Sequence, residues 1–135
     1  MSLKYNLGVS GDINTPQGLE VYVYNEEKVA SIKLYNFEFL EILHNGMYNL
    51  LPDEPNFNYS NCLLSFNLYV NENYRKNGYG KIIVNLALEE CKKLNVEYFL
   101  GYRMYNNKES ELFWNKMNFT KLINDENIEV FYKKI

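Results

Sequence analysis

Residues 63–80 read LLSFNLYVNENYRKNGYG, and this stretch decides the fold. Residues 63–70 are rich in β-forming side chains and apolar on both faces, which predicts a central strand covered on each side. The strand leads into the glycine turn RKNGYG, residues 75–80, and then into a helix. The first N–H groups of a helix have no intrahelical acceptor, and glycine lets a ligand approach the backbone closely. The stretch therefore predicts an anion-binding turn whose ligand carries phosphate.

The residues after the turn predict a helix and a second buried strand. Placed at 100° intervals, residues 81–94 separate into a polar arc and an apolar arc, and Glu90 alone intrudes on the apolar one. Residues 96–102 read as another buried strand, so strand, helix and strand predict a crossover with two parallel strands. The polar arc holds Asn85, Glu89, Lys92 and Lys93, and the apolar arc holds Ile83, Leu86, Ala87, Cys91 and Leu94.

Two hairpins are predicted at the ends of the chain. Residues 19–24 and 29–35 each have the pattern of a β-strand, and a polar turn lies between them. Residues 119–123 and 128–132 show the same arrangement. Antiparallel hairpins added to a parallel crossover make the sheet mixed. The predicted fold class is α/β (α+β), in a single domain over residues 1–135.

The remaining segments are a short helix, a weakly defined strand and a loop. Asn106 followed by Glu109 is a capping box that opens a helix through Met117. Residues 37–43 favour a strand over a helix, and the prolines within residues 51–56 predict a surface loop. The helix should bury a stripe that includes Leu112, Phe113 and Met117.

Composition excludes several classes of function. The chain has 135 residues, 47% of them hydrophobic and 23% charged, with a formal net charge of −3, as expected of a folded domain. Without a basic excess, nucleic acid is not an expected partner. No apolar run is long enough to span a membrane and the N-terminus lacks a signal-peptide core, so the cytoplasm is the expected location. Cys62 and Cys91 are expected to be buried thiols, and His44 alone cannot build a metal site.

Other phosphate-binding motifs fit the turn poorly. A nucleotide P-loop needs Ser or Thr after its lysine, but Lys81 is followed by Ile82. A dinucleotide fold needs a third glycine where Ile83 stands. The pattern Arg-x-x-Gly-x-Gly by itself also occurs in ordinary turns, so its neighbours must decide.

In that context the chain resembles the GNAT superfamily of N-acetyltransferases over residues 63–132. The family's acetyl-CoA signature, Arg or Gln, two residues, Gly, one residue, and Gly or Ala, is matched by Arg75, Gly78 and Gly80, after a Leu-x-Val strand end at residues 68–70. The family's later pattern is an Asn, a small residue three positions on, an aromatic residue four beyond that, and a Gly-Phe pair. It is echoed by Asn107, Ser110, Trp114 and Asn118-Phe119. Residues 10–18 leave no room for the family's two early helices, so the acceptor side is either reduced or rebuilt from residues 37–60 or a second subunit.

The resemblance implies that acetyl-CoA is bound mainly by backbone groups. The N–H groups of the turn hold the pyrophosphate, and the main chain of residues 68–70 pairs with the pantetheine arm. Two simpler readings remain open, that Arg75 only forms surface ion pairs and that Asn107 only caps a helix. The implied cofactor residues are Leu68, Tyr69, Val70, Arg75, Lys76, Asn77, Gly78, Tyr79, Gly80, Lys81, Asn107 and Trp114.

For catalysis, the resemblance leaves the acid and the base open. Family members often use a tyrosine to protonate the departing thiolate, but that position holds Trp114, whose indole is not a useful acid. Either no dedicated acid exists, or Tyr102 or Tyr105 supplies the proton. Residues 65 and 67 stand in the strand that often carries the family's glutamate, and neither is basic. The candidate bases are Glu38, Glu41 and His44, if the earlier segment that holds them folds over the thioester.

The expected function is transfer of an acetyl group from acetyl-CoA to a primary amine of a small molecule or a peptide. A GNAT-like module that binds CoA without turnover is the alternative, and a structural domain without a cofactor ranks last. The apolar strands near the C-terminus are compatible with a homodimer and equally with a monomer.

Overall fold

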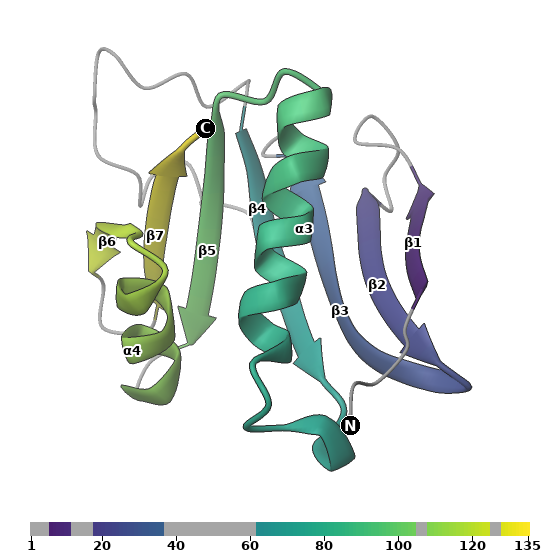
Figure 1. Ribbon diagram of the computed structural model, residues 1–135. Helices are drawn as coiled ribbons and strands as arrows, with labels where there is room; N and C mark the ends of the chain where they lie inside the picture. Colours follow the sequence, from purple (N-terminus) through teal and green to yellow (C-terminus); the bar gives the residue numbers. More distant parts are fainter. Residues whose placement is uncertain (1–5, 12–17, 37–61, 105–107, 125–127) are drawn as a thin grey trace.

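The computed structural model describes residues 6–11, 18–36, 62–104, 108–124 and 128–135. The described strands form one sheet of seven strands in the order β1-β2-β3-β4-β5-β7-β6, with α3 and α4 on one of its faces (Figure 1). The elements are β1 (Asn6–Gly11), β2 (Leu19–Asn25), β3 (Glu27–Asn36), β4 (Cys62–Val70), a 3-10 turn (Glu72–Tyr74), α3 (Tyr79–Lys93), β5 (Tyr98–Met104), α4 (Lys108–Lys116), β6 (Thr120–Asn124) and β7 (Ile128–Lys134).

The sheet is mixed, as the sequence predicts. β4 and β5 pair in parallel and are joined by α3, whereas all the other neighbouring strands pair antiparallel. Both predicted hairpins are confirmed, as β2–β3 and β6–β7. The predicted strand at residues 37–43 and the predicted loop at 51–56 lie outside the described residues.

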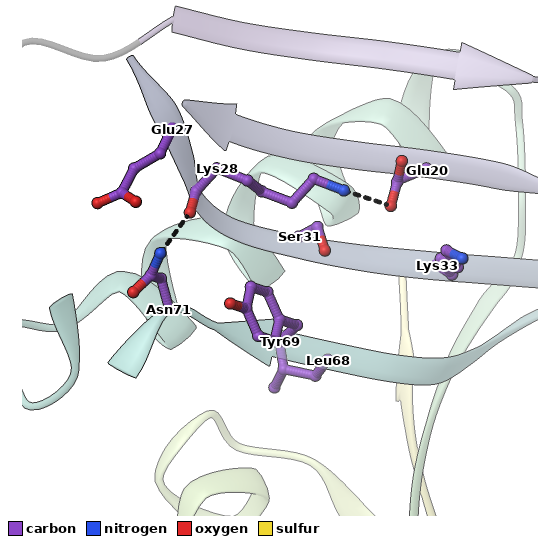
Figure 2. A pocket seen from close by; sticks show the side chains of 8 residues that line it. All are labelled: Glu20, Glu27, Lys28, Ser31, Lys33, Leu68, Tyr69 and Asn71. Carbon is purple, nitrogen blue, oxygen red and sulfur yellow. Dashed lines mark hydrogen bonds and ion pairs between the residues drawn. The ribbon is translucent and has the colours of Figure 1, made fainter. Parts of the chain in front are cut away.

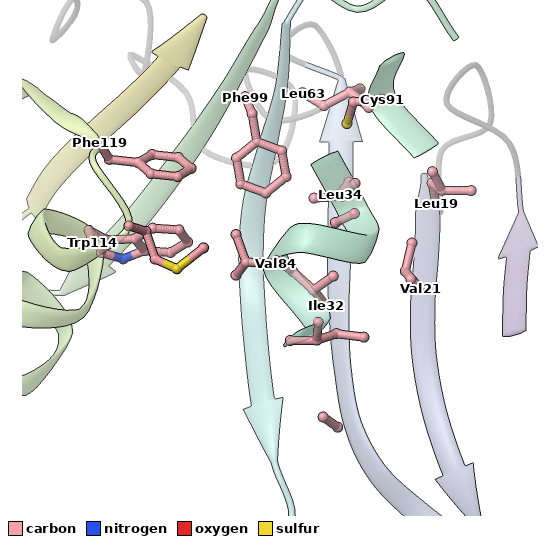
Figure 3. Close-up of a cluster of buried hydrophobic side chains, with 14 of the residues drawn as sticks. Leu19, Val21, Ile32, Leu34, Leu63, Val84, Cys91, Phe99, Trp114 and Phe119 are labelled. Atoms are coloured by element: carbon pink, nitrogen blue, oxygen red, sulfur yellow. The ribbon is translucent and has the colours of Figure 1, made fainter. Parts of the chain in front are cut away.

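The core lies between the sheet and the two helices (Figure 3). Alternation along β2 and β3 sends Val21 and Ile32 toward α3, where they meet Val84. Each such aliphatic side chain contributes about 1.5–3 kcal/mol when it is fully buried. On the β5 side, the ring of Trp114 packs against those of Phe99 and Phe119, with centroid separations of 6.5 and 4.8 Å. One continuous core therefore fixes both helices on the sheet.

Glu90, the exception on the apolar arc of α3, is accommodated at the helix edge. Its carboxylate forms an ion pair with Lys93, three residues later, at 3.0 Å. This pair leaves the apolar face of the helix to the residues that touch the sheet.

Three sequence predictions need correction. Helix α3 begins at Tyr79 rather than at Lys81, because Gly78 takes the left-handed conformation (φ 82°) and acts as its N-cap. Leu94 is 43% exposed, since it follows the last helical residue and leaves the buried arc. Leu112 is 59% exposed, and Trp114 takes its place on the buried side of α4 together with Met117. A step of 100° per residue puts position 112 on the solvent side when 114 and 117 face the core.

Strand β1 was not predicted. It pairs antiparallel with β2 along its whole length, although its sequence NLGVSG contains two glycines and only one β-branched residue. The ring of Tyr22 from the neighbouring strand lies over Gly8, at the position that a Cβ of residue 8 would occupy. The Tyr22 ring thus covers Gly8 in place of a side chain. Because this contact comes from another strand, the sequence of residues 6–11 alone does not predict it.

Among the described residues, no helix is both long and apolar enough to cross a membrane.

Candidate functional site

Strands β4 and β5 pair only over their first halves. Their ladder runs from the pair Cys62–Tyr98 to the pair Ser65–Gly101. Residues 66–70 of β4 and 102–104 of β5 continue without pairing to each other, and the two strands visibly diverge (Figure 1). The hydrogen-bonded ladder therefore ends at Ser65–Gly101, and beyond it the backbones of the two strands separate; this separation between the two backbones is called the gap.

A β-bulge accounts for the divergence. On β3, Lys33 pairs with Asn67, whereas the next residue, Leu34, pairs with Ser65, so residue 66 is the extra one on β4. A bulge bends the strand that carries it and increases its local twist. The bend begins directly after the last β4–β5 pair, so the bulge turns the second half of β4 away from β5.

The second half of β4 turns main-chain groups toward the gap. The N–H of Asn71 donates to the carbonyl of Val29 at 2.8 Å. Antiparallel strands alternate between residues that bond to the partner and residues that face away from it, so Tyr69 bonds to β3 opposite Ser31. The N–H and C=O groups of Leu68 and Val70 then face away from β3, toward the gap. This is the orientation that the resemblance implies for a ligand arm, and the contact itself stays a prediction.

The turn after β4 is held by its own side chains. The Asn77 amide Nδ2 donates to the carbonyls of Tyr74 and Arg75, each at 3.2 Å. Lys76 and Gly78 both have positive φ, 65° and 82°, a pattern that aims successive N–H groups inward and forms concave anion sites. Lys76 holds this conformation without being glycine, which indicates a backbone strained by its surroundings.

The N-terminus of α3 is open to an anion. Its N-cap is Gly78, which has no side chain that could cap the helix, and the first turn contains no acidic residue. A Cβ at residue 78 would meet no atom of the described residues within 4 Å, so among them the space beside it is free. The first N–H groups of the helix have no intrahelical acceptor, and the exposed Lys76 and Lys81 add positive charge. This end of the helix attracts an anionic group such as phosphate.

Gly80 is also where the two helices approach each other. A Cβ at residue 80 would lie 3.3 Å from the Phe113 ring of α4 and 4.0 Å from Cγ2 of Val70. The missing side chain therefore lets α4 and β4 come close to the first turn of α3.

Arg75 is tied to β4 rather than to an acid. Its Nε donates to the carbonyl of Val70 at 3.2 Å. Within the described residues, the ion pairs are Lys28–Glu20 and Lys93–Glu90, and neither involves Arg75. A ligand arm that bonds to the carbonyl of Val70 would have to take the place of this guanidinium.

The structure describes the positions of three further predicted residues. Tyr79 is buried, with its ring edge-on to that of Tyr74 at a centroid separation of 5.9 Å, so only its main chain faces the turn. Tyr69, with its main chain bonded to β3, is 44% exposed. Tyr102 belongs to β5 just beyond the last β4–β5 pair. Tyr105, Asn107, Glu38, Glu41 and His44 lie outside the described residues.

Trp114 lies in the core, 1% exposed, beside the narrow end of the gap. A Cβ on Gly101 would be 2.8 Å from Cε2 of its indole, so the indole rests where a residue 101 side chain would be. Its Nε1 is the buried side-chain polar atom without a hydrogen-bond partner among the described residues. Almost none of the Trp114 surface is exposed, and the cofactor contact implied for it stays a prediction.

Sequence reasoning missed Gly101, which lies at the narrow end of the gap. Ser65 is 2% exposed and pairs with Gly101, where the ladder ends. A glycine within a buried strand often marks a close approach of another group, and that signal was present at residue 101. No group of three or more His, Cys, Asp or Glu side chains that could hold a metal occurs in the part of the chain that the structure describes.

Comparison with known proteins gives a family and a fold. A model of the acetyltransferase (GNAT) family matches residues 16–119. No curated protein sequence matches the chain.

Solved structures share the fold at low sequence identity. A putative streptothricin acetyltransferase from Bacillus anthracis, in complex with acetyl coenzyme A, has a TM-score of 0.65 and 14% identity, over 98% of this chain and 87% of that one. The PaiA N-acetyltransferase from Thermoplasma acidophilum, in complex with coenzyme A, has a TM-score of 0.64 and 16% identity. That match covers 86% of this chain and 60% of the Thermoplasma protein. The ribosomal-protein-S18-alanine N-acetyltransferase from Escherichia coli has a TM-score of 0.63 and 13% identity, over 89% of this chain and 72% of that one.

Proposed function

Because the chain belongs to the acetyltransferase (GNAT) family, we propose that it transfers an acetyl group from acetyl-CoA to a primary amine of a small molecule or a peptide. The observation that carries the proposal is the gap between β4 and β5, which leads to the open N-terminus of α3. A ligand with an extended polar arm and a pyrophosphate matches both parts at once.

The residues present fit acetyl-CoA. The first-turn N–H groups of α3 would hold the pyrophosphate, with Gly78 leaving room and Lys76 and Lys81 adding charge. The outward main-chain groups of Leu68 and Val70 would pair with the amides of the pantetheine arm. Solved relatives of the same fold are described as bound to coenzyme A or acetyl coenzyme A, which supports this cofactor.

The chemistry combines an activated acyl group with a positioned amine. Acetyl-CoA, when bound, would supply a thioester whose acyl carbon forms the new N–C bond while its C–S bond breaks and a thiolate departs. The amine must be neutral to attack, so a base takes its proton. We assign protonation of the thiolate to Tyr102 or Tyr105, because the indole of Trp114 cannot release a proton usefully.

A thermal-shift titration tests the cofactor. A ligand that binds only the native state at 100 times its Kd stabilises it by about 2.7 kcal/mol, so acetyl-CoA and CoA should each raise Tm by several degrees. ATP, which has phosphates but no pantetheine arm, serves as the control and should give a smaller shift. An unchanged Tm with saturating acetyl-CoA would remove the cofactor assignment.

Turnover is tested separately by release of free CoA, detected with a thiol reagent. The two cysteines of the protein should not interfere, because burial raises the pKa of Cys62 and Cys91 to about 12, with Glu90 adding to the effect at Cys91. At pH 8 both thiols stay protonated and out of reach of solvent. We therefore expect the native protein to react negligibly with Ellman's reagent within minutes, and two thiols to react once it is unfolded in guanidinium. Rapid reaction of the native protein would contradict the described burial.

A CoA-binding module without turnover is the second candidate. It is favoured by the burial of Trp114, which puts a side chain that cannot act as an acid where relatives often have a tyrosine. Tight binding of acetyl-CoA without CoA release across a broad panel of amines would support this candidate over the enzyme.

A further inference from the structure

Strand β1 forms an edge of the sheet that lacks the usual protection. It stands first in the strand order, and among the described residues no other strand pairs with its outer side (Figure 1). Proteins commonly protect such an edge with a charged side chain, a proline or a β-bulge. The sequence of β1, NLGVSG, has no charge and no proline, and its register with β2 is regular. The opposite edge strand, β6, contains Lys121 and an irregular register. Of the two edges, β1 is therefore the one open to another strand.

The alternation of hydrogen bonds across the sheet determines which residues of β1 face outward. Ser31 of β3 bonds to β4, so its neighbour Ile32 bonds to β2, where its partner is Val21. Tyr22, the residue after Val21, then bonds to β1, where its partner is Gly8. The residues at positions 7 and 9, on either side of Gly8, therefore direct their N–H and C=O groups away from β2 and past the edge of the sheet.

The same two residues, Leu7 and Val9, expose their side chains. Their partners on β2 are Val23 and Val21, which are buried, so all four side chains lie on the face of the sheet that carries α3. Helix α3 packs against β2, β3 and β4, and Leu7 and Val9 remain 44% and 43% exposed. Two apolar side chains therefore stand directly beside the outward main-chain groups.

A second copy of β1 matches this edge in both main chain and side chains. With two antiparallel copies placed about a two-fold axis at Gly8, Leu7 of each copy lies opposite Val9 of the other. Both residues face outward, so the two Leu7–Val9 pairs exchange four main-chain hydrogen bonds. Directly opposite side chains share a face, so the same register covers the four exposed apolar side chains. A register shifted by one residue would instead set outward groups against groups already bonded to β2.

Charges near β1 do not oppose this pairing. On the face opposite α3, Ser10 of β1 has Glu20 of β2 as its partner, and the Glu20 carboxylate forms an ion pair with Nζ of Lys28 at 3.4 Å (Figure 2). The polar cavity drawn in Figure 2 is lined by residues of β2, β3 and the end of β4, and by none of β1. Strands β2 and β3 also separate β1 from the gap. Two copies joined at β1 therefore meet without like-charge repulsion and leave the candidate site uncovered.

We propose that the outer edge of β1 is a dimer interface, at which a second copy of this chain adds its own β1 in antiparallel orientation. The two sheets then form one continuous sheet, with Leu7 of each copy opposite Val9 of the other. Because the two-fold axis uses the open edge of both copies, assembly stops at the dimer. The interface does not depend on acetyl transfer, so it stands or falls separately from the proposed function.

Sedimentation velocity of the untagged chain over roughly 1–200 µM tests the interface. We expect a reversible dimer whose share grows with concentration. Val9→Pro removes an outward N–H and leaves the bonds to β2 intact, so the far-UV circular dichroism should stay unchanged. The variant loses two hydrogen bonds per dimer, and its dimer Kd should rise about tenfold or more. A native chain that stays monomeric throughout this range, or a folded Val9→Pro variant with an unchanged dimer Kd, would overturn the proposal.

A charge-exchange pair tests the register. A variant with lysine at both positions 7 and 9, and a second with glutamate at both, should each be monomeric because like charges would lie opposite each other. An equimolar mixture should form a dimer, since every lysine then faces a glutamate. The matched control places lysine at Leu94 and Leu112, which are 43% and 59% exposed on other surfaces, and should keep the native dimer. A mixture that stays monomeric, or a lysine variant at 7 and 9 that still dimerises, would contradict the Leu7–Val9 pairing.

Discussion

Substitution of Gly80 by aspartate is expected to lower the affinity for acetyl-CoA by about 100-fold or more while the protein stays folded. The new carboxylate would stand in the first turn of α3, where the helix N-terminus and nearby lysines otherwise attract phosphate. A hundredfold loss corresponds to about 2.7 kcal/mol, which a like charge near a bound pyrophosphate readily supplies. An acidic residue in the first turn also favours the helix itself, so unfolding is not the expected outcome. Calorimetric titration with acetyl-CoA gives the affinity.

Two variants separate charge from shape in this experiment. Gly80→Ala adds only the Cβ, which would lie 3.3 Å from the Phe113 ring, so a small loss of affinity is expected after α4 shifts slightly. Asn85→Asp adds the same charge at an exposed position of α3 beyond the first turn and should leave affinity almost unchanged. If Gly80→Asp bound acetyl-CoA as tightly as Asn85→Asp, the assignment of this turn to the pyrophosphate would be wrong.

Replacement of Trp114 by alanine is expected to destabilise the protein by about 3–5 kcal/mol. The indole is 1% exposed, packs against Phe99 and Phe119, and fills the space above Gly101, so its removal leaves a large cavity in the core. Total stabilities of domains are about 5–15 kcal/mol, so the variant should lie close to its unfolding limit at room temperature. Urea unfolding followed by far-UV circular dichroism measures the difference, since the variant lacks the only tryptophan.

Trp114→Phe is the matched variant. It keeps an aromatic ring and removes an indole N–H that has no partner among the described residues, so it should recover most of the loss. Gly101→Ala should also destabilise, because its Cβ would collide with the indole. A cost below about 1 kcal/mol for Trp114→Ala would show that the indole is not packed as described.

The crossover was predictable because its signals are local. The apolar run of residues 63–70, the glycine turn and the two-arc pattern of α3 are contiguous in sequence, and the structure places them in that order. The glycine conformation at residue 78 shows why the start of the helix was misplaced. A glycine can end a turn or cap a helix, and only the observed φ decides between these roles.

The missed features depend on residues far apart in the chain. Gly101 and Trp114 fit each other across two elements, and neither residue alone indicates the contact. The outward direction of residues 7 and 9 follows from the registers of β1, β2 and β3, which a single strand pattern does not determine. The orientation of Leu68 and Val70, by contrast, was implied by the resemblance, and the hydrogen bond from Asn71 to Val29 of β3 is the observation from which it follows.

The short β4–β5 ladder divides the sheet into two groups of strands. Strands β1–β4 form the first group and β5–β7 the second. The residue pairs from Cys62–Tyr98 to Ser65–Gly101 join the two groups. Beyond these pairs, the Phe113 ring of α4 lies close to Gly80 of α3. The absent side chain of residue 80 therefore permits this close approach of α4 to the first turn of α3. An extended ligand arm that bonds to both β4 and β5 beyond these pairs would therefore lengthen the hydrogen-bonded join between the two groups of strands.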